Sequence, residues 1–295
     1  MSSKKNIIIT GGAGFVGTNL IELLLKRTKY NIISIDNYSS GRKKNHIKSS
    51  RVKYLKGETV NISKLLKNFK NIKTLFHFGE FARIYQSFFH MNECVNSNSI
   101  GSNAVFNFCL KNKIKLIYSA TSASLGNKGN DKNLSPYAFS KAKNLEQLEN
   151  FKIFFKLKYE IIYFYNVYGP NQIAKGFMST VIGIFEDHYL RKRPLPVVRP
   201  GTQTRRFTHI DDTIKIVYQA WKKKLNRHYI IANTKSHSVL EVAKMFKSKI
   251  RYLPKRDGER YASALVNKNL SNKIYKYYGK ISLKDYIRDF LKKNS

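Results

Sequence analysis

The stretch TGGAGFVG, residues 10–17, follows a short apolar run at 6–10 and leads into an apolar helical pattern at 15–26. Gly11, Gly14 and Gly17 repeat every third residue where a predicted strand turns into a predicted helix. Glycine permits a tight turn and lets a pyrophosphate approach the backbone N–H groups without a Cβ in the way. The helix start adds partial positive charge. The stretch therefore predicts a dinucleotide-binding loop.

An acidic residue, Asp36, ends the next strand-like run at 31–36. Its carboxylate can accept hydrogen bonds from both hydroxyls of a ribose, whereas a 2′-phosphate there would meet a like charge. This favours NAD over NADP. The residues that follow, including Asn37, Ser40 and Gly41, are expected to line the adenosine side of the site.

Strand-like runs continue at 52–55, 73–78, 115–119 and 160–164, with helical patterns between several of them. This alternation is typical of a parallel sheet wrapped by helices. Glycines and prolines interrupt the pattern after residue 165, so we predict a dinucleotide-binding domain at 1–165 and a smaller lobe occupying most of 166–295. Runs at 205–210 and 228–232 predict a return to the first sheet near 205–235. Ser238 and Glu241 form a candidate capping box.

The composition is strongly basic, with 55 Lys and Arg against 18 Asp and Glu, a formal net charge of +37. The basic residues form short clusters spread along the chain, which leaves two interpretations open: a compositional bias of the surface, or attraction of an anionic substrate or polyanion. Cys94 and Cys109 make no metal or disulfide framework. Apolar runs are too short to span a membrane, so we expect a cytoplasmic protein, and neither membrane nor nucleic acid as its partner.

The stretch SPYAFSK, residues 135–141, predicts the start of a helix that runs to about 156. Ser135 can cap the helix through its hydroxyl, and Pro136 suits the first helical position, where no N–H is needed. Tyr137 and Lys141 then lie one turn apart on one face, close enough to interact.

The sequence resembles the extended short-chain dehydrogenase/reductases, and within them the nucleotide-sugar epimerases. The resemblance lies in the glycine loop, Asp36 and the Tyr137–Lys141 pair, which follow one another in this order. Similar motifs extend over nearly the whole chain: DNYSSG at 36–41, HFGEFARIYQS at 77–87, YSATSASLG at 118–126, YFYNVYGPNQ at 163–172, GTQTRRFTHIDD at 201–212 and KRDGER at 255–260. The resemblance implies an α/β fold, a Rossmann-type doubly wound parallel sheet with a smaller C-terminal α+β substrate lobe. It also implies bound NAD and a homodimer.

The resemblance assigns the reacting groups. Tyr137 corresponds to the acid/base that exchanges a proton with a sugar hydroxyl, and Lys141 to the residue that binds the nicotinamide ribose. A phenol with a pKa near 10 is a poor base at neutral pH, so it needs positive neighbours. Thr121 corresponds to the hydroxyl that hydrogen-bonds the reacting oxygen, with Ser122 as the alternative. Further cofactor contacts are expected from Phe15, Val16, Glu58, Phe78 and Gly79.

Substrate contacts are expected from residues that match the family's nucleotide-diphosphate site. Asn166, Arg205 and Arg256 would hold the diphosphate of a UDP-sugar, since guanidinium groups form forked hydrogen bonds with such anions. Glu259 would hold the nucleotide ribose, and Ser122 would face the sugar. Glu80 departs from the small residue usual at its position and is expected in the sugar pocket.

The function that the resemblance implies is NAD-dependent epimerisation of a nucleotide sugar through a keto-sugar, with the hydride passed to NAD and back. A dehydrogenase or ketoreductase needs the same residues and remains an alternative. From a different class, the chain would be a non-catalytic, NAD-sensing module with a polyanion partner. A 4,6-dehydratase is disfavoured because Thr121 is followed by Ser122 and Ala123, where those enzymes carry an Asp-Glu pair.

Overall fold

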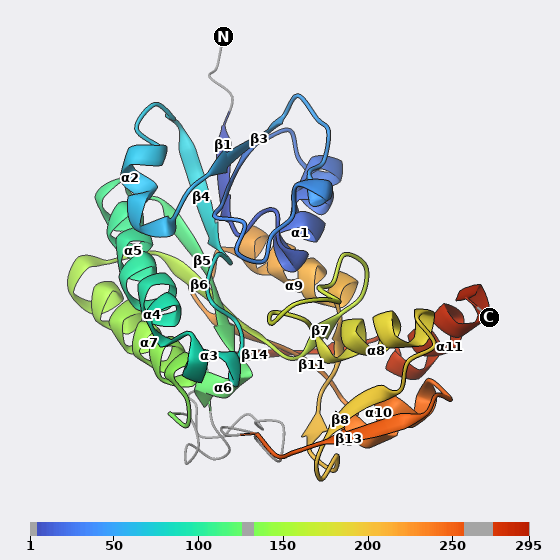
Figure 1. The fold of residues 1–295 in the computed structure, drawn as a ribbon. Coiled ribbons are helices and arrows are strands. Elements are labelled where there is room, and N and C mark those ends of the chain that lie inside the picture. The colour runs from blue at the N-terminus through green and yellow to red at the C-terminus, as the bar shows by residue number, and fades with distance from the viewer. Residues whose placement is uncertain (1–4, 126–132, 257–273, 295) are drawn as a thin grey trace.

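The computed structural model describes residues 5–125, 133–256 and 274–294. Eight parallel strands form the central sheet, in the order β14-β11-β6-β5-β4-β1-β2-β3 (Figure 1). The strands are β1 (Asn6–Thr10), β2 (Asn31–Asp36), β3 (Val52–Lys56), β4 (Ile72–His77), β5 (Lys115–Thr121), β6 (Tyr159–Phe164), β11 (His228–Asn233) and β14 (Ile274–Gly279). The order reverses between β1 and β4, which is where doubly wound sheets bind ligands.

Helices cover both faces of this sheet, which confirms the predicted doubly wound architecture. On one face lie α1 (Phe15–Arg27) and α9 (Ile210–Lys223), and on the other α2 (Ile62–Leu65), α5 (Ser102–Lys111) and α7 (Pro136–Phe155). Because both faces are covered, the central strands are apolar throughout rather than alternating. In β1, for example, Ile7, Ile8 and Ile9 are all fully buried.

The two predicted helix starts are confirmed. The hydroxyl of Ser135 accepts a hydrogen bond from the N–H of Ala138 at 3.1 Å, and Pro136 opens α7. Ser238 and Glu241 form the reciprocal capping box at the start of α10 (Val239–Met245). The first cap matters for the site, because it fixes where Tyr137 enters the helix.

The smaller lobe packs α8 (Val181–Leu190), α10 and α11 (Leu283–Asn294) around the parallel pair β8 (Leu195–Val198) and β13 (Ile250–Leu253). Residues 205–210 do not form the single returning strand that we predicted. They contain β9 (Thr204–Arg205) and β10 (Thr208–His209), which pair with β12 (His237–Ser238) and β7 (Val167–Tyr168). The return to the main sheet is made by β11, and β14 is a second return that the sequence analysis did not identify.

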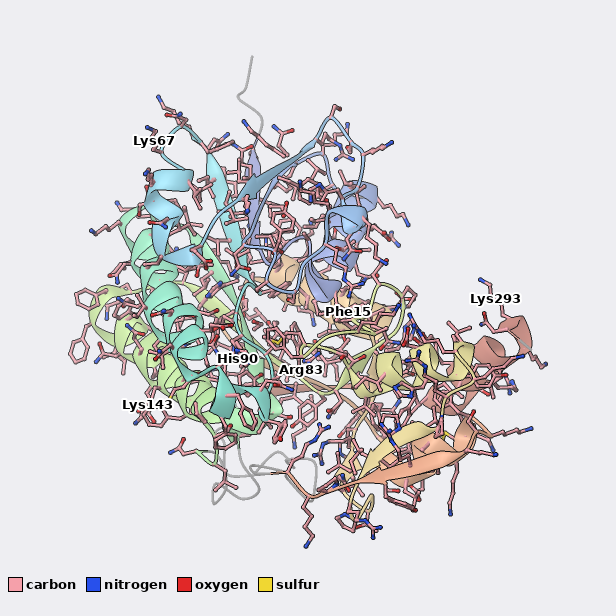
Figure 2. All side chains as sticks on the ribbon, viewed as in Figure 1. Phe15, Lys67, Arg83, His90, Lys143 and Lys293 are labelled. Carbon is pink, nitrogen blue, oxygen red and sulfur yellow. The ribbon has the colours of Figure 1, made fainter. Side chains whose placement is uncertain are left out.

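Short helices line the space between the two lobes: α3 (Gln86–Phe89), α4 (Met91–Val95), a π-helix (Asn96–Gly101) and α6 (Ser122–Leu125). Within the described ranges, no helix is both long and apolar enough to cross a bilayer. Basic side chains are dispersed: Lys67, Lys143 and Lys293 point outward at three separate edges of the molecule (Figure 2). Arg83, in contrast, lies near the centre.

Candidate cofactor and substrate site

A cavity of about 1100 Å³ lies at the carboxyl ends of the central strands and continues toward the smaller lobe. It brings together most of the residues selected from sequence: Gly11, Gly14, Phe15, Val16, Gly17, Asp36, Asn37, Ser40, Glu58, Phe78, Gly79, Glu80, Thr121, Ser122, Tyr137, Lys141, Asn166 and Arg205. Residues far apart in the chain, from Gly11 to Arg205, therefore line one cavity.

Two selected residues, Gly41 and Arg256, do not line the cavity. Gly41 packs against the Asp36 carboxylate rather than lining the cavity. Arg256 lies beside the cavity. Its guanidinium carbon is 4.8 Å from the centre of the ring of Tyr85, which is a lining residue. Glu259 lies outside the described residues. Its role therefore stays a prediction.

The glycine loop passes very close to the loop that follows β4. Gly11 has a φ of +71°, and a Cβ there would lie 2.8 Å from the backbone nitrogen of Gly79. Any other residue would push the two loops apart and strain the turn. This close approach fixes the glycine loop and Gly79 together in the wall of the cavity.

Asp36 is fixed in place before any ligand arrives. Its two carboxylate oxygens accept hydrogen bonds from the N–H of Ala13 at 2.9 Å and of Tyr38 at 2.8 Å. A Cβ on Gly41 would lie 2.6 Å from this carboxylate, so only glycine leaves it room. Burial raises the pKa of Asp36, while the two N–H groups oppose that effect. Carboxylate oxygens have further lone pairs, which can accept the ribose hydroxyls.

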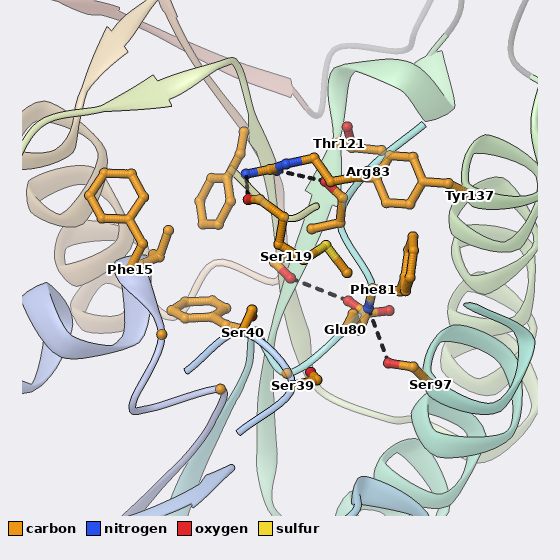
Figure 3. A pocket seen from close by; sticks show the side chains of 18 of the residues that line it. Phe15, Ser39, Ser40, Glu80, Phe81, Arg83, Ser97, Ser119, Thr121 and Tyr137 are labelled. Atoms are coloured by element: carbon orange, nitrogen blue, oxygen red, sulfur yellow. Dashed lines mark hydrogen bonds between the residues drawn. The ribbon is translucent and has the colours of Figure 1, made fainter. Parts of the chain in front are cut away.

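Tyr137 stands across the cavity from Phe15 (Figure 3). Its backbone N–H donates to the hydroxyl of Ser87 at 3.2 Å, and its phenol hydrogen-bonds Thr121. Burial raises the pKa of Tyr137 to about 12, although the bond to Thr121 acts in the opposite direction. The arrangement supplies a titratable oxygen and a neighbouring hydroxyl at one point of the wall.

The ammonium of Lys141 is held by a buried acid. Its Nζ lies 2.5 Å from a carboxylate oxygen of Glu80 and also donates to the carbonyl of Ser119. Both side chains are almost fully buried, with exposed fractions of 4% for Lys141 and 3% for Glu80. The ammonium also lies 4.3 Å from the centre of the Tyr118 ring.

Glu80 collects hydrogen bonds from four further groups. The donors are the hydroxyls of Ser102 at 2.8 Å, Tyr118 at 3.0 Å and Ser119 at 3.3 Å, and the amide of Asn144 at 3.2 Å. Burial alone would raise the pKa of Glu80, but the charges of Lys141 and His77 and the hydrogen bonds from Lys141 and Ser102 together outweigh it, so the pKa lies below its usual value. Contact of Glu80 with a sugar stays a prediction, because protein groups already surround its carboxylate.

Sequence analysis did not single out Arg83, which lines the same cavity. Its signal is weak in so basic a chain: one arginine inside the motif HFGEFARIYQS. Its importance follows only from the fold, which brings it toward Tyr137 and the loop before α8.

The sequence profile of the NAD dependent epimerase/dehydratase family matches residues 7–232, most of the chain. The chain belongs to this family. Among relatives, the Bacillus subtilis UDP-glucose epimerase YtcB, itself uncharacterized, is 27% identical over 228 residues, covering 71% of this chain and 70% of the relative. The UDP-N-acetyl-alpha-D-glucosaminuronate decarboxylase of Bacillus cytotoxicus is 26% identical over 254 residues, covering 81% and 78%.

Solved structures share the fold. The UDP-glucose 4-epimerase of Thermotoga maritima, determined with UDP-glucose, superposes with a TM-score of 0.85, a sequence identity of 24% and coverage of 97% of each chain. As a member of the epimerase/dehydratase family, the protein is an NAD-dependent enzyme. The residues present fit that cofactor: Gly11, Gly14 and Gly17, which carry no Cβ, and the Asp36 carboxylate line one cavity, and these are the groups that a pyrophosphate and a ribose hydroxyl need.

Proposed function

We propose that the chain is an NAD-dependent nucleotide-sugar epimerase that inverts one sugar carbon through a transient keto-sugar. The observation that carries the proposal is the placement of Tyr137, Thr121 and Lys141 in the same cavity as the glycine loop. A proton-exchanging phenol then lies next to the dinucleotide site, where oxidation of a sugar hydroxyl requires it.

The protein's own groups handle the proton. The Tyr137 phenolate takes it from the sugar hydroxyl, and Thr121, hydrogen-bonded to the phenol, positions the reacting oxygen. Burial disfavours the phenolate, and the charge of Arg83 works against that effect. When bound, NAD accepts the hydride of the sugar carbon and returns it to the other face of the keto-sugar.

A UDP-sugar is the substrate that we propose. Asn166 and Arg205 line the cavity, and Arg256 stands beside it. An amide and two guanidinium groups are the kinds of group that bind a diphosphate. Two proteins similar to this chain support the choice of nucleotide: one is named a UDP-glucose epimerase, and another was solved with UDP-glucose.

A nucleotide-sugar dehydrogenase or ketoreductase is the second candidate function, because it uses the same phenol, hydroxyl and lysine. Such an enzyme differs from an epimerase only in the cofactor: it releases the cofactor in the other redox state, whereas an epimerase regenerates NAD in place. A third alternative is a non-catalytic, NAD-sensing module with a polyanion partner. In that case Tyr137 and Thr121 would lie together in the cavity without taking part in a reaction. Negligible affinity of the protein for nucleic acid at physiological salt would exclude this alternative.

Incubation of the purified protein with NAD and a panel of UDP-sugars tests the proposal. NADH absorbance and the stereochemistry of the recovered sugar are read together. Inverted sugar without net NADH supports the epimerase, whereas NADH in proportion to sugar consumed supports the dehydrogenase. No conversion of any sugar, with NAD still bound, would contradict both.

We also propose a homodimer in the cytoplasm. Exposed apolar side chains gather on two helices in contact with each other: Met91 and Val95 on α4, and Phe139, Ile153 and Phe154 on α7. Apolar patches of this kind mark interfaces between proteins. Light scattering coupled to size-exclusion chromatography measures the mass, and a monomer at micromolar concentration would contradict the dimer.

A further inference from the structure

Arg83, in the loop after β4, reaches across the cavity to the loop that precedes α8. Its Nε donates to the carbonyl of Ser179 at 3.1 Å and its Nη2 to the carbonyl of Met178 at 2.5 Å, while Nη1 donates to the carbonyl of Ala82 at 2.7 Å. Dashed lines in Figure 3 mark bonds of the guanidinium. The side chain is partly exposed and lines the cavity, so its exposed part faces the ligand space.

The guanidinium of Arg83 has donors to spare. It carries five N–H groups, one on Nε and two on each terminal nitrogen. One N–H of each nitrogen is used in the three bonds to carbonyls. One N–H on Nη1 and one on Nη2 therefore lack an acceptor among the described residues. They belong to the two terminal nitrogens, which in proteins can receive both oxygens of a carboxylate.

The positive charge of Arg83 also lacks a counter-charge in the described part of the chain. Glu80, three residues earlier, is paired with Lys141, and no other described carboxylate forms an ion pair with Arg83. Burial lowers the pKa of Arg83, so its surroundings disfavour the charge. A ligand in the cavity would withdraw this charge from water, and charges withdrawn from water in proteins are normally paired. The three carbonyls that Arg83 contacts are neutral, so they supply no counter-charge.

Arg83 stands near Tyr137, the candidate acid/base (Figure 3). Its charge acts on the phenol of Tyr137, and Tyr137 must lie within hydrogen-bond reach of the reacting sugar hydroxyl. Arg205 and Arg256 are the guanidinium groups assigned to the diphosphate. A partner of Arg83 is therefore attached to the sugar, close to the carbon that reacts.

We propose that Arg83 binds an acid group on the sugar, and that the substrate is a nucleotide-linked sugar acid of the uronic type. The proposal rests on the proposed function and narrows its substrate class. The carboxylate of the sugar supplies the missing counter-charge and accepts the two remaining N–H groups. A neutral sugar would leave the cation unpaired in the closed site, which costs affinity.

A matched pair of probes, UDP-glucuronate and UDP-glucose, tests the proposal with the NAD-loaded full-length protein. We expect kcat/KM for the acid to exceed that for the neutral sugar by about 10-fold to 100-fold, the value of one charge-assisted bond. Arg83→Gln removes the charge and should abolish this preference, measured as the ratio of the two kcat/KM values, because the lost charge also disfavours the Tyr137 phenolate with either sugar. Arg193→Gln, an exposed arginine outside the cavity, should change neither rate. Equal rates for both sugars, or equal losses in Arg83→Gln, would overturn the proposal.

Binding separates this proposal from the epimerase itself. Calorimetry on a Tyr137→Phe background measures the affinity for both probes without turnover, and circular dichroism checks the fold of each variant. An Arg83-dependent preference for UDP-glucuronate, in a native protein that converts no sugar, would refute the epimerase and keep the role of Arg83. Turnover of neutral sugars without a preference in binding would keep the epimerase and refute the role of Arg83.

Discussion

Two buried lysine–glutamate pairs lie at opposite ends of the central sheet, each with an N–O distance of 2.5 Å. Lys115 and Glu160 stand at the amino ends of β5 and β6, with exposed side-chain fractions of 12% and 0%. Glu80 follows β4 at the carboxyl end, where Lys141 meets it from α7. The pairs match in composition and burial but have different neighbours.

At the amino end the neighbours are backbone groups. Glu160 accepts hydrogen bonds from the N–H of Asn226 at 3.0 Å and of Arg227 at 2.7 Å, which ties the approach to β11 onto β6. Glu80 is surrounded by side-chain hydroxyls and an amide, lines the cavity, and its charge raises the pKa of Tyr137. A buried ion pair alone therefore does not mark a site. What marks one is a titratable neighbour within a cavity.

The largest effect is expected from the tyrosine at the carboxyl end. Tyr137→Phe removes the proton-exchanging oxygen, so kcat should fall by about 10²-fold to 10⁴-fold while NAD binding is retained. Tyr159→Phe is the matched control at the amino end, where the phenol donates to Glu149 at 2.6 Å. Its kcat should stay near that of the native protein. Full activity of Tyr137→Phe would show that the residues at the carboxyl end of the sheet do not form the active site.

A smaller effect, confined to stability, is expected from Glu160→Gln. The amide cannot accept from Lys115 and both backbone N–H groups, so unfolding by urea should become easier by about 1–3 kcal/mol. Since Glu160 lies far from the cavity lining, kcat/KM should not change. A change in kcat/KM in a folded sample would show that the two ends of the sheet are coupled.

The smallest effect concerns the pH profile. Burial raises the pKa of Tyr137 to about 12, and the charge of Glu80 adds to this, so the phenolate fraction and kcat/KM should rise from neutral to alkaline pH. Glu80→Gln removes the negative charge that raises the pKa of Tyr137. The change favours the phenolate, so the rise should occur about one pH unit lower.

The control for that profile is Glu146→Gln, which removes an exposed carboxylate, 56% accessible, from the same helix as Lys141. Its profile should coincide with the native one. An unshifted profile in Glu80→Gln, or a shift to higher pH, would show that Glu80 does not act on Tyr137. The two carboxylates would then both be structural.

Local signals made the fold and the dinucleotide loop predictable. The glycine spacing, the position of Asp36 and the start of α7 each depend on residues within a few turns of one another. The partners of Glu80 come from α5, β5 and α7, and nothing in the local sequence specifies that they converge. Arg83 is hidden for the same reason, because its contacts lie almost a hundred positions away in the chain.

Prediction failed where strands were very short or returned late. The run 205–210 has strand-like composition, but its two strands of two residues each pair outside the main sheet. β14 follows a long excursion through the smaller lobe, and its partner β11 is more than forty residues earlier. Pairing over such separations is decided by tertiary packing rather than by local pattern.

β14 is the outermost strand of the sheet, and only its pairing with β11 keeps that inner strand from being an edge. Tyr275 and Tyr277 also stack on Tyr229, which is fully buried. A chain cut before residue 274 would bare a row of backbone N–H and C=O groups flanked by isoleucines. Strand edges of that kind recruit other chains. Shortening the protein at its carboxyl terminus should therefore produce aggregates during expression rather than a smaller enzyme.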